Sequence, residues 1–207
     1  MKFALLKAGT AVLGAAALAL VSAPQALAAT DINYDCQAST PLGPQTSALT
    51  QTVDATAPAT VAPGGSFDVV VDPAAGQVPT SAAGFTIKNV NTFTLKVPVP
   101  ANATFAGIAL AGGSNLGGTP TATQSGGVIT IKFPGPIAGG STYELPTITA
   151  HLTAGPSGVV TSTLGGTSYS NPGLTFNTVV STFLGNITAP TSCFPNPNPV
   201  LTSTTIG

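Results

Sequence analysis

The chain has 207 residues, of which 5% are charged and 43% are hydrophobic, and its formal net charge is −1. Without the N-terminal signal described next, three lysines and six carboxylates remain, with no arginine, for a net charge of −3. Three scattered lysines do not form the cationic cluster that neutralises phosphates, so this composition excludes nucleic acid and favours an uncharged partner, such as cell-wall glycan or another envelope protein.

The N-terminus has the pattern of an export signal. Lys2 and Lys7 precede a small apolar run over residues 11–21, and the tripeptide ALA ending at Ala28 matches a cleavage site. The apolar run is shorter than the roughly 20 residues of a membrane-spanning helix, and no later run reaches that length. We therefore expect residues 1–28 to be a signal peptide and the mature chain to be secreted or envelope-associated and not membrane-spanning.

The mature chain contains two cysteines, Cys36 and Cys193. An even pair in an exported chain predicts a disulfide. A structural zinc site is the competing interpretation, but two cysteines and one distant histidine do not give four closely spaced ligands. The disulfide would tie an N-terminal segment, residues 29–47, to a C-terminal segment, residues 191–207.

Between these segments, apolar and polar residues alternate in short runs that end at glycine or proline, which is typical of half-buried antiparallel strands. In the run over residues 66–72, for example, Phe67, Val69 and Val71 share one face. Strands are predicted over residues 48–54, 66–72, 91–99, 103–110, 119–124, 128–133, 142–153, 158–164, 174–184 and 186–189.

Many short strands without a helical stripe predict an all-β fold, namely an immunoglobulin-like, two-sheet antiparallel β-sandwich over residues 48–190. Tryptophan is absent and the cysteines lie near the two ends. The prediction therefore concerns the architecture and not a true immunoglobulin domain.

The only glutamate and the only histidine, Glu144 and His151, lie in one stretch, STYELPTITAHL. The apolar alternation slips at Pro146-Thr147, as a bulge would make it do, and places both side chains on the outward face. Seven residues of extended strand span about 23 Å, which is too far for a direct acid/base pair. We therefore interpret both as surface polar residues, while His151 could still act alone or with an aspartate that the fold brings near.

No other pattern indicates catalysis. The chain lacks the G-x-S-x-G turn of serine hydrolases. Asp68 and Asp72 lie on one strand face about 13 Å apart, farther than the roughly 6.5 to 9.5 Å of an inverting glycosidase. We predict no catalytic, cofactor-binding or metal-binding residue.

Several longer strings resemble secreted proteins of actinobacteria related to Rhodococcus, Gordonia and Nocardia: YDCQAS, GGVITIKFPGPIAGGSTYELPTIT, GTSYSNPGLTFN and CFPNPNPVLTSTTIG. The resemblance covers the mature chain. It implies a secreted or envelope-associated β-sandwich protein, and it carries no catalytic or binding residue with it.

The leading hypothesis is an exported, non-enzymatic envelope protein with a binding or structural role. One alternative is a small secreted hydrolase of envelope glycan or lipid that is centred on His151. A further alternative is an oligomeric envelope channel.

Overall fold

The structure is a computed structural model that describes residues 24–26, 29–183 and 185–207. Apart from residues 24–26, the predicted signal peptide lies outside the described residues. The described chain consists of strands joined by turns and bends and contains no helix. It therefore has no helix of the length and apolar character that crossing a membrane requires.

Most strands belong to one large sheet, in which every pairing is antiparallel. Along the sheet the strands follow in this order: β10 (Thr121–Ser125), β11 (Val128–Phe133), β8 (Phe85–Pro98), β16 (Leu174–Thr182), β17 (Gly185–Pro195), β2 (Thr30–Thr40), β3 (Gly43–Pro58), β5 (Ser66–Pro73), β14 (Thr147–Ala154) and β9 (Ala103–Ala111). Three short strands pair beside them: β1 (Pro24–Ala26) with β3, and both β7 (Ser81–Ala82) and β12 (Ile137–Ala138) with β8.

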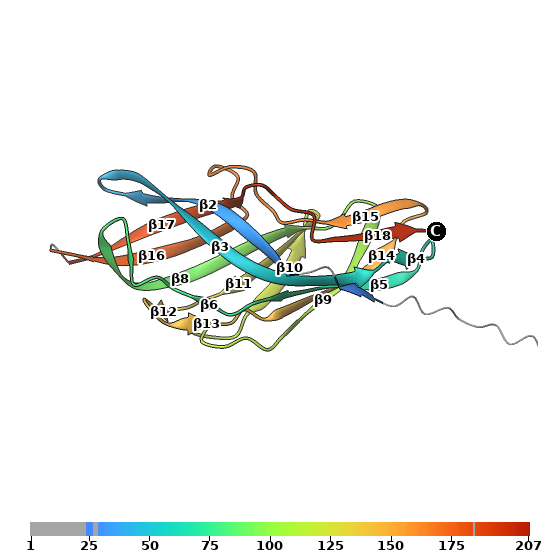
Figure 1. Ribbon diagram of the computed structural model, residues 1–207, viewed down its shortest axis with the longest axis horizontal. Helices are drawn as coiled ribbons and strands as arrows, with labels where there is room; N and C mark the ends of the chain where they lie inside the picture. The colour runs from blue at the N-terminus through green and yellow to red at the C-terminus, as the bar shows by residue number, and fades with distance from the viewer. Residues whose placement is uncertain (1–23, 27–28, 184) are drawn as a thin grey trace, which may run out of the picture.

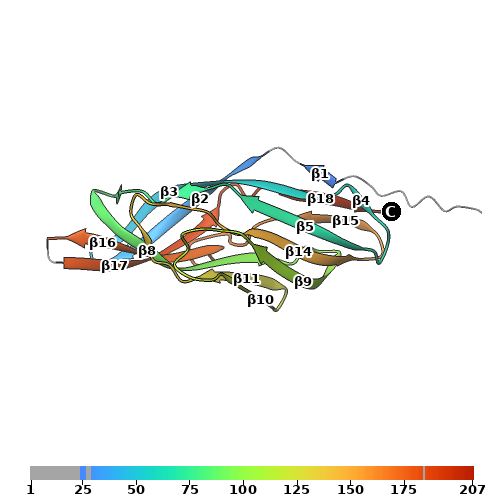
Figure 2. The same cartoon turned by 90° about the horizontal axis from the view of Figure 1, so that it is seen from below.

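The sheet curls on itself, so that its two end strands, β9 and β10, approach each other. The result is an elongated, nearly barrel-shaped molecule (Figure 1, Figure 2). A separate three-stranded sheet is formed by β15 (Gly158–Ser162), β18 (Thr202–Ile206) and β4 (Thr60–Val61), in which β18 and β4 are parallel. A last small pair joins β6 (Gly76–Gln77) to β13 (Thr142–Tyr143).

The all-β, antiparallel prediction is confirmed, and an observed strand overlaps every range predicted from the alternation. The structure adds strands in both predicted terminal segments, notably β2 and β18. The topology shows an all-β, mainly antiparallel fold but does not specifically show an immunoglobulin-like, two-sheet sandwich. That part of the prediction stays a prediction.

One end of the molecule has a packed core. The three-stranded sheet covers this end, toward the right in Figure 1. Val160 of β15 and Leu152 of β14 are each only 1% exposed there. The cluster that fills this end comprises Ala57, Phe67, Val69, Leu152, Ala154, Val160 and Ile206. We call it the closed end.

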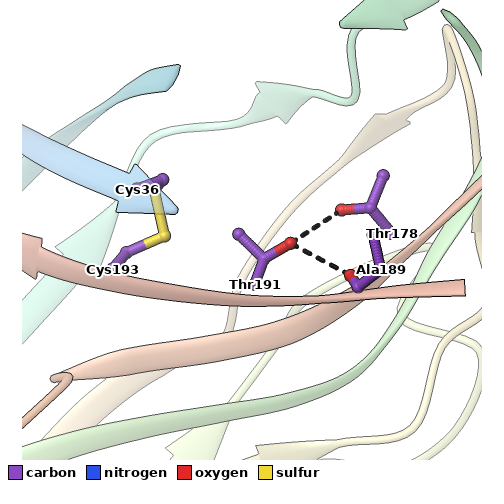
Figure 3. Close-up of a disulfide and its surroundings, with 5 residues drawn as sticks. All are labelled: Cys36, Thr178, Ala189, Thr191 and Cys193. Carbon is purple, nitrogen blue, oxygen red and sulfur yellow. Dashed lines mark hydrogen bonds between the residues drawn. A yellow bond between two sulfur atoms is a disulfide. The ribbon is translucent and has the colours of Figure 1, made fainter. Parts of the chain in front are cut away.

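The predicted disulfide between Cys36 and Cys193 is confirmed. The two cysteines are directly opposite each other on β2 and β17, with their Cα atoms 4.1 Å apart, and both are buried. The bond therefore joins neighbouring strands of one sheet (Figure 3). On the same strand the Thr191 hydroxyl lies 3.2 Å from the Thr178 hydroxyl and donates to the Ala189 carbonyl at the same distance.

Candidate functional site

A cavity of about 670 Å³ occupies the interior of the large sheet beyond the closed end. This volume falls in the range of roughly 300 to 1,000 Å³ that small-molecule sites in proteins span. Side chains of β2, β3, β5, β8, β11, β14, β16 and β17 form its wall. We take this cavity as the candidate site.

The alternation of each strand makes the wall apolar, because successive side chains point to opposite faces. On β16, Leu174, Phe176 and Val180 line the cavity, whereas Thr175 and Asn177 between them do not. All residues of β16 are only half-buried. Leu174, Phe176 and Val180 thus pack against buried clusters and also line the cavity, which leaves them incompletely covered.

Three aromatic rings form one part of the wall. Phe93 stacks on Phe133 with ring centroids 4.5 Å apart, and on Phe176 with centroids 5.3 Å apart. These rings come from three neighbouring strands, β8, β11 and β16. Together they offer a flat apolar surface that suits hydrocarbon.

None of the lining residues is charged. The polar lining residues include two tyrosines, Tyr34 and Tyr143. Burial raises the pKa of both phenols. Neither hydroxyl makes a hydrogen bond within the described chain, and neither is an enclosed polar atom that lacks a partner. Both tyrosines line the cavity, and the Tyr143 hydroxyl lies against Gly76.

Gly76 shows how closely Tyr143 is fitted. A Cβ atom at Gly76 would lie 2.6 Å from Cζ of the Tyr143 ring. Residue 76 must therefore be glycine for the β6–β13 pair to hold the ring in this position.

Glu144 and His151, which the sequence singles out, lie outside this cavity. The backbone of Glu144 forms an isolated bridge with Ser114, and its side chain is exposed. His151 Nδ1 lies 2.7 Å from Asp68 Oδ1 across the β14–β5 pair, and both side chains are about half exposed. The structure thus gives Glu144 and His151 different partners, and it brings to His151 an aspartate that sequence spacing does not identify.

In the part of the chain that the structure describes, no three or more histidine, cysteine, aspartate or glutamate residues group closely enough to hold a metal ion.

The sequence analysis misses the cavity because alternation predicts which side chains point inward but not whether they fill the space between them. A signal is nevertheless present. Several inward positions hold small side chains, including Ala38, Ala150, Thr178 and Ala189, and the chain has no tryptophan. Side chains of this size leave volume unfilled when a sheet closes around them.

Comparison with known proteins gives little beyond the fold. No protein-family model matches the chain, and no curated protein matches it. A solved structure, "Crystal structure of Putative membrane anchored protein from Corynebacterium diphtheriae", aligns with a TM-score of 0.58 and 19% identity over 86% of this chain. The match spans 37% of that protein's length, and at this identity it shows a similar fold alone.

Proposed function

We propose that the protein is an exported, non-enzymatic component of the cell envelope that binds an elongated apolar ligand, of the long-chain lipid class, in its cavity. The observation that carries this proposal is the uncharged, largely hydrocarbon wall of a cavity of about 670 Å³. Each methylene transferred from water into such a wall contributes about 0.8 kcal/mol, so an acyl chain gains affinity along its whole length.

An envelope location is supported by three independent features. The N-terminal residues have the pattern of an export signal. The Cys36–Cys193 disulfide fits an oxidising compartment. The structural neighbour from Corynebacterium diphtheriae is described as membrane anchored. Contact of the uncharged outer surface with wall glycan or another envelope protein belongs to the same proposal.

Lipid binding is tested with a matched pair of tryptophan substitutions on β2. Ala38 lines the cavity and Ser39, the next residue, is exposed on the outside. An indole at position 38 occupies space that several methylenes would fill, so Ala38→Trp should weaken binding of BODIPY-labelled palmitic acid about tenfold or more. Ser39→Trp should bind like the wild type, and unlabelled palmitic acid should displace the probe from both.

Failure of the wild type to bind the probe, measured by fluorescence polarisation, would contradict the proposal. Equal binding by the Ala38→Trp variant would also contradict it, because the lipid would then lie elsewhere. Unchanged circular dichroism and unfolding midpoints in both variants establish that the comparison concerns the cavity and not folding.

The His151–Asp68 pair favours a second candidate, the hydrolase. An aspartate that holds a histidine is the arrangement that orients a general base. Panels of fluorescent esters and glycosides, assayed with the wild type and with His151→Ala, separate the two candidates. Hydrolysis that disappears in the His151→Ala variant would establish the hydrolase, whereas the binding proposal expects no turnover in either protein and unchanged probe binding.

A further inference from the structure

Three hairpin turns surround the end of the cavity opposite the closed end, and each contributes lining residues there. They are the turn between β2 and β3 at Pro41 and Leu42, the turn between β7 and β8 at Ala83, and the turn between β16 and β17 at Phe183. The β2–β3 and β16–β17 hairpins project toward the left of Figure 1, away from β15 and β18. We call these three turns the mouth of the cavity.

Two of the turns are built in the same way. The β2–β3 turn has the sequence TPLG, residues 40–43, and the β16–β17 turn has the sequence TFLG, residues 182–185. In each, the threonine hydroxyl donates to the glycine carbonyl at 2.7 Å. The two glycines have φ of 100° and 116°, in the region that side chains disfavour. In both turns threonine and glycine are joined in this way, and the described residues between them, Pro41, Leu42 and Phe183, are apolar.

The side chains of Leu42 and Phe183 lie in solvent. Phe183 is 96% exposed and Leu42 is 81% exposed, which makes them the most exposed of the large hydrophobic residues in the described chain. Hairpin turns are ordinarily filled by asparagine, aspartate and glycine. Two turns that carry large apolar residues at the rim of one apolar cavity indicate a surface built to enter an apolar medium.

The lack of charged residues in the three turns indicates which kind of apolar medium they would enter. The segments 40–45, 79–85 and 181–187 contain no lysine, arginine, aspartate or glutamate, and their polar residues are threonine, serine, glutamine and asparagine. A surface without cations does not select anionic headgroups. Uncharged hydroxyl and amide groups beside aromatic and aliphatic side chains match the neutral headgroup region of a lipid layer.

We propose that the mouth docks on a neutral lipid surface, with Leu42 and Phe183 inserted among the acyl chains and the cavity opening into the lipid. Docking uses the exposed side chains of Leu42 and Phe183 and does not require a ligand inside the cavity. It therefore stands or fails separately from ligand binding inside the cavity.

Flotation of the full mature chain with phosphatidylcholine vesicles tests this proposal. Leu42→Ser and Phe183→Ser should each weaken vesicle binding about tenfold, and the double variant about a hundredfold, because each removes one side chain from the hydrocarbon. Val159→Ser is the matched control, since Val159 is 45% exposed on β15 at the closed end. It should bind as the wild type does, with no dependence on salt.

The absence of tryptophan from the chain gives a direct readout of insertion. Phe183→Trp places a single indole at the mouth, and its emission should shift to shorter wavelength on addition of phosphatidylcholine vesicles. Val159→Trp should show no shift. The substituted side chains are exposed, so unfolding midpoints should remain unchanged.

Several results would overturn the proposal. These are no flotation of the wild type with phosphatidylcholine, flotation that requires phosphatidylglycerol, or equal loss in the Val159→Ser control. Sedimentation velocity without vesicles could give a further contradicting result. If the wild type were a dimer and the double variant a monomer, the mouth would be a self-association surface.

Discussion

The two ends of the molecule are made from the same kind of alternating strand, yet one is filled by a packed cluster and the other surrounds a cavity. At the closed end a second layer, β15–β18–β4, lies over the large sheet, and large side chains such as Phe67 and Leu152 meet in a packed cluster. Around the cavity, side chains of β2 and β16 also take part in packed clusters, but several lining residues are small and β16 is only half-buried. Hydrophobic alternation therefore specifies a sheet, whereas a covering layer and large side chains decide whether its interior becomes core or cavity.

The contrast between the packed closed end and the cavity also concerns the balance between stability and function. Packed apolar area supplies the folding free energy that burial provides, both at the closed end and in two further clusters of buried side chains, around Tyr34 and around Ile137. The cavity wall keeps apolar surface in reach of water, which costs stability in the free protein and becomes favourable when apolar groups fill it.

Removal of the disulfide should have the largest effect, because the bond closes a long loop between two strands of the cavity wall. The cysteines are 157 residues apart in the sequence. In the chain-entropy model, a loop of this length stabilises the folded state by about 5 kcal/mol. The double variant Cys36→Ala, Cys193→Ala should lose this amount in urea unfolding under non-reducing conditions.

Hydrogen exchange in that double variant sharpens the comparison of the two ends. Protection should fall first in β2, β16 and β17, while β5, β14 and β15 keep theirs until global unfolding. Uniform loss of protection along the chain would show that the two ends unfold as one unit.

A matched pair of phenylalanines tests the same contrast at smaller scale. Phe67 is buried in the closed-end cluster, whereas Phe85 is partly buried at the mouth. Phe67→Ala should destabilise the fold by about 4 kcal/mol, since it leaves a cavity in a packed core. Phe85→Ala should cost about 1 kcal/mol, since its surroundings already include open space. Similar losses measured by denaturant titration would contradict the distinction between a filled and a hollow end.

Much of this fold follows from sequence pattern. Runs such as residues 66–72 and 128–133 alternate so regularly that their inward faces are evident, and both are strands in the structure. The break at Pro146-Thr147 also lies where the alternation slips, since β13 ends at Tyr143 and β14 begins at Thr147.

What the sequence does not predict depends on neighbours distant in the chain. Strand β18 reads TSTTI and has almost no apolar alternation, but Thr202 and Thr204 are buried because their hydroxyls donate to Ser162 Oγ and to the Pro58 carbonyl. The Asp68 partner of His151 and the cavity depend in the same way on which strands lie side by side. Which strands pair is decided by the tertiary structure, and local periodicity does not determine it.

The smallest expected effect concerns Tyr34, which belongs to a packed cluster and also lines the cavity. Its side chain is buried. Desolvation raises the pKa of this phenol above its ordinary value of 10.0, so the folded state holds the proton more tightly than the unfolded state does. The resulting stability is fully present below about pH 10 and is lost as the pH rises above it.

Tyr34→Phe should change stability by about 1 kcal/mol or less at neutral pH, because the hydroxyl has no partner in the described chain to lose. Above about pH 10 the variant should lose stability less steeply than the wild type, and Tyr143 accounts for part of the slope that remains, because its pKa is raised for the same reason. Tyr169→Phe is the control, since Tyr169 packs edge-on against Phe194 and does not line the cavity. Urea unfolding between neutral and strongly alkaline pH measures both variants. An unchanged alkaline slope in Tyr34→Phe would mean that water reaches the phenol freely, and the inner wall of the cavity would then be wetter than its apolar lining implies.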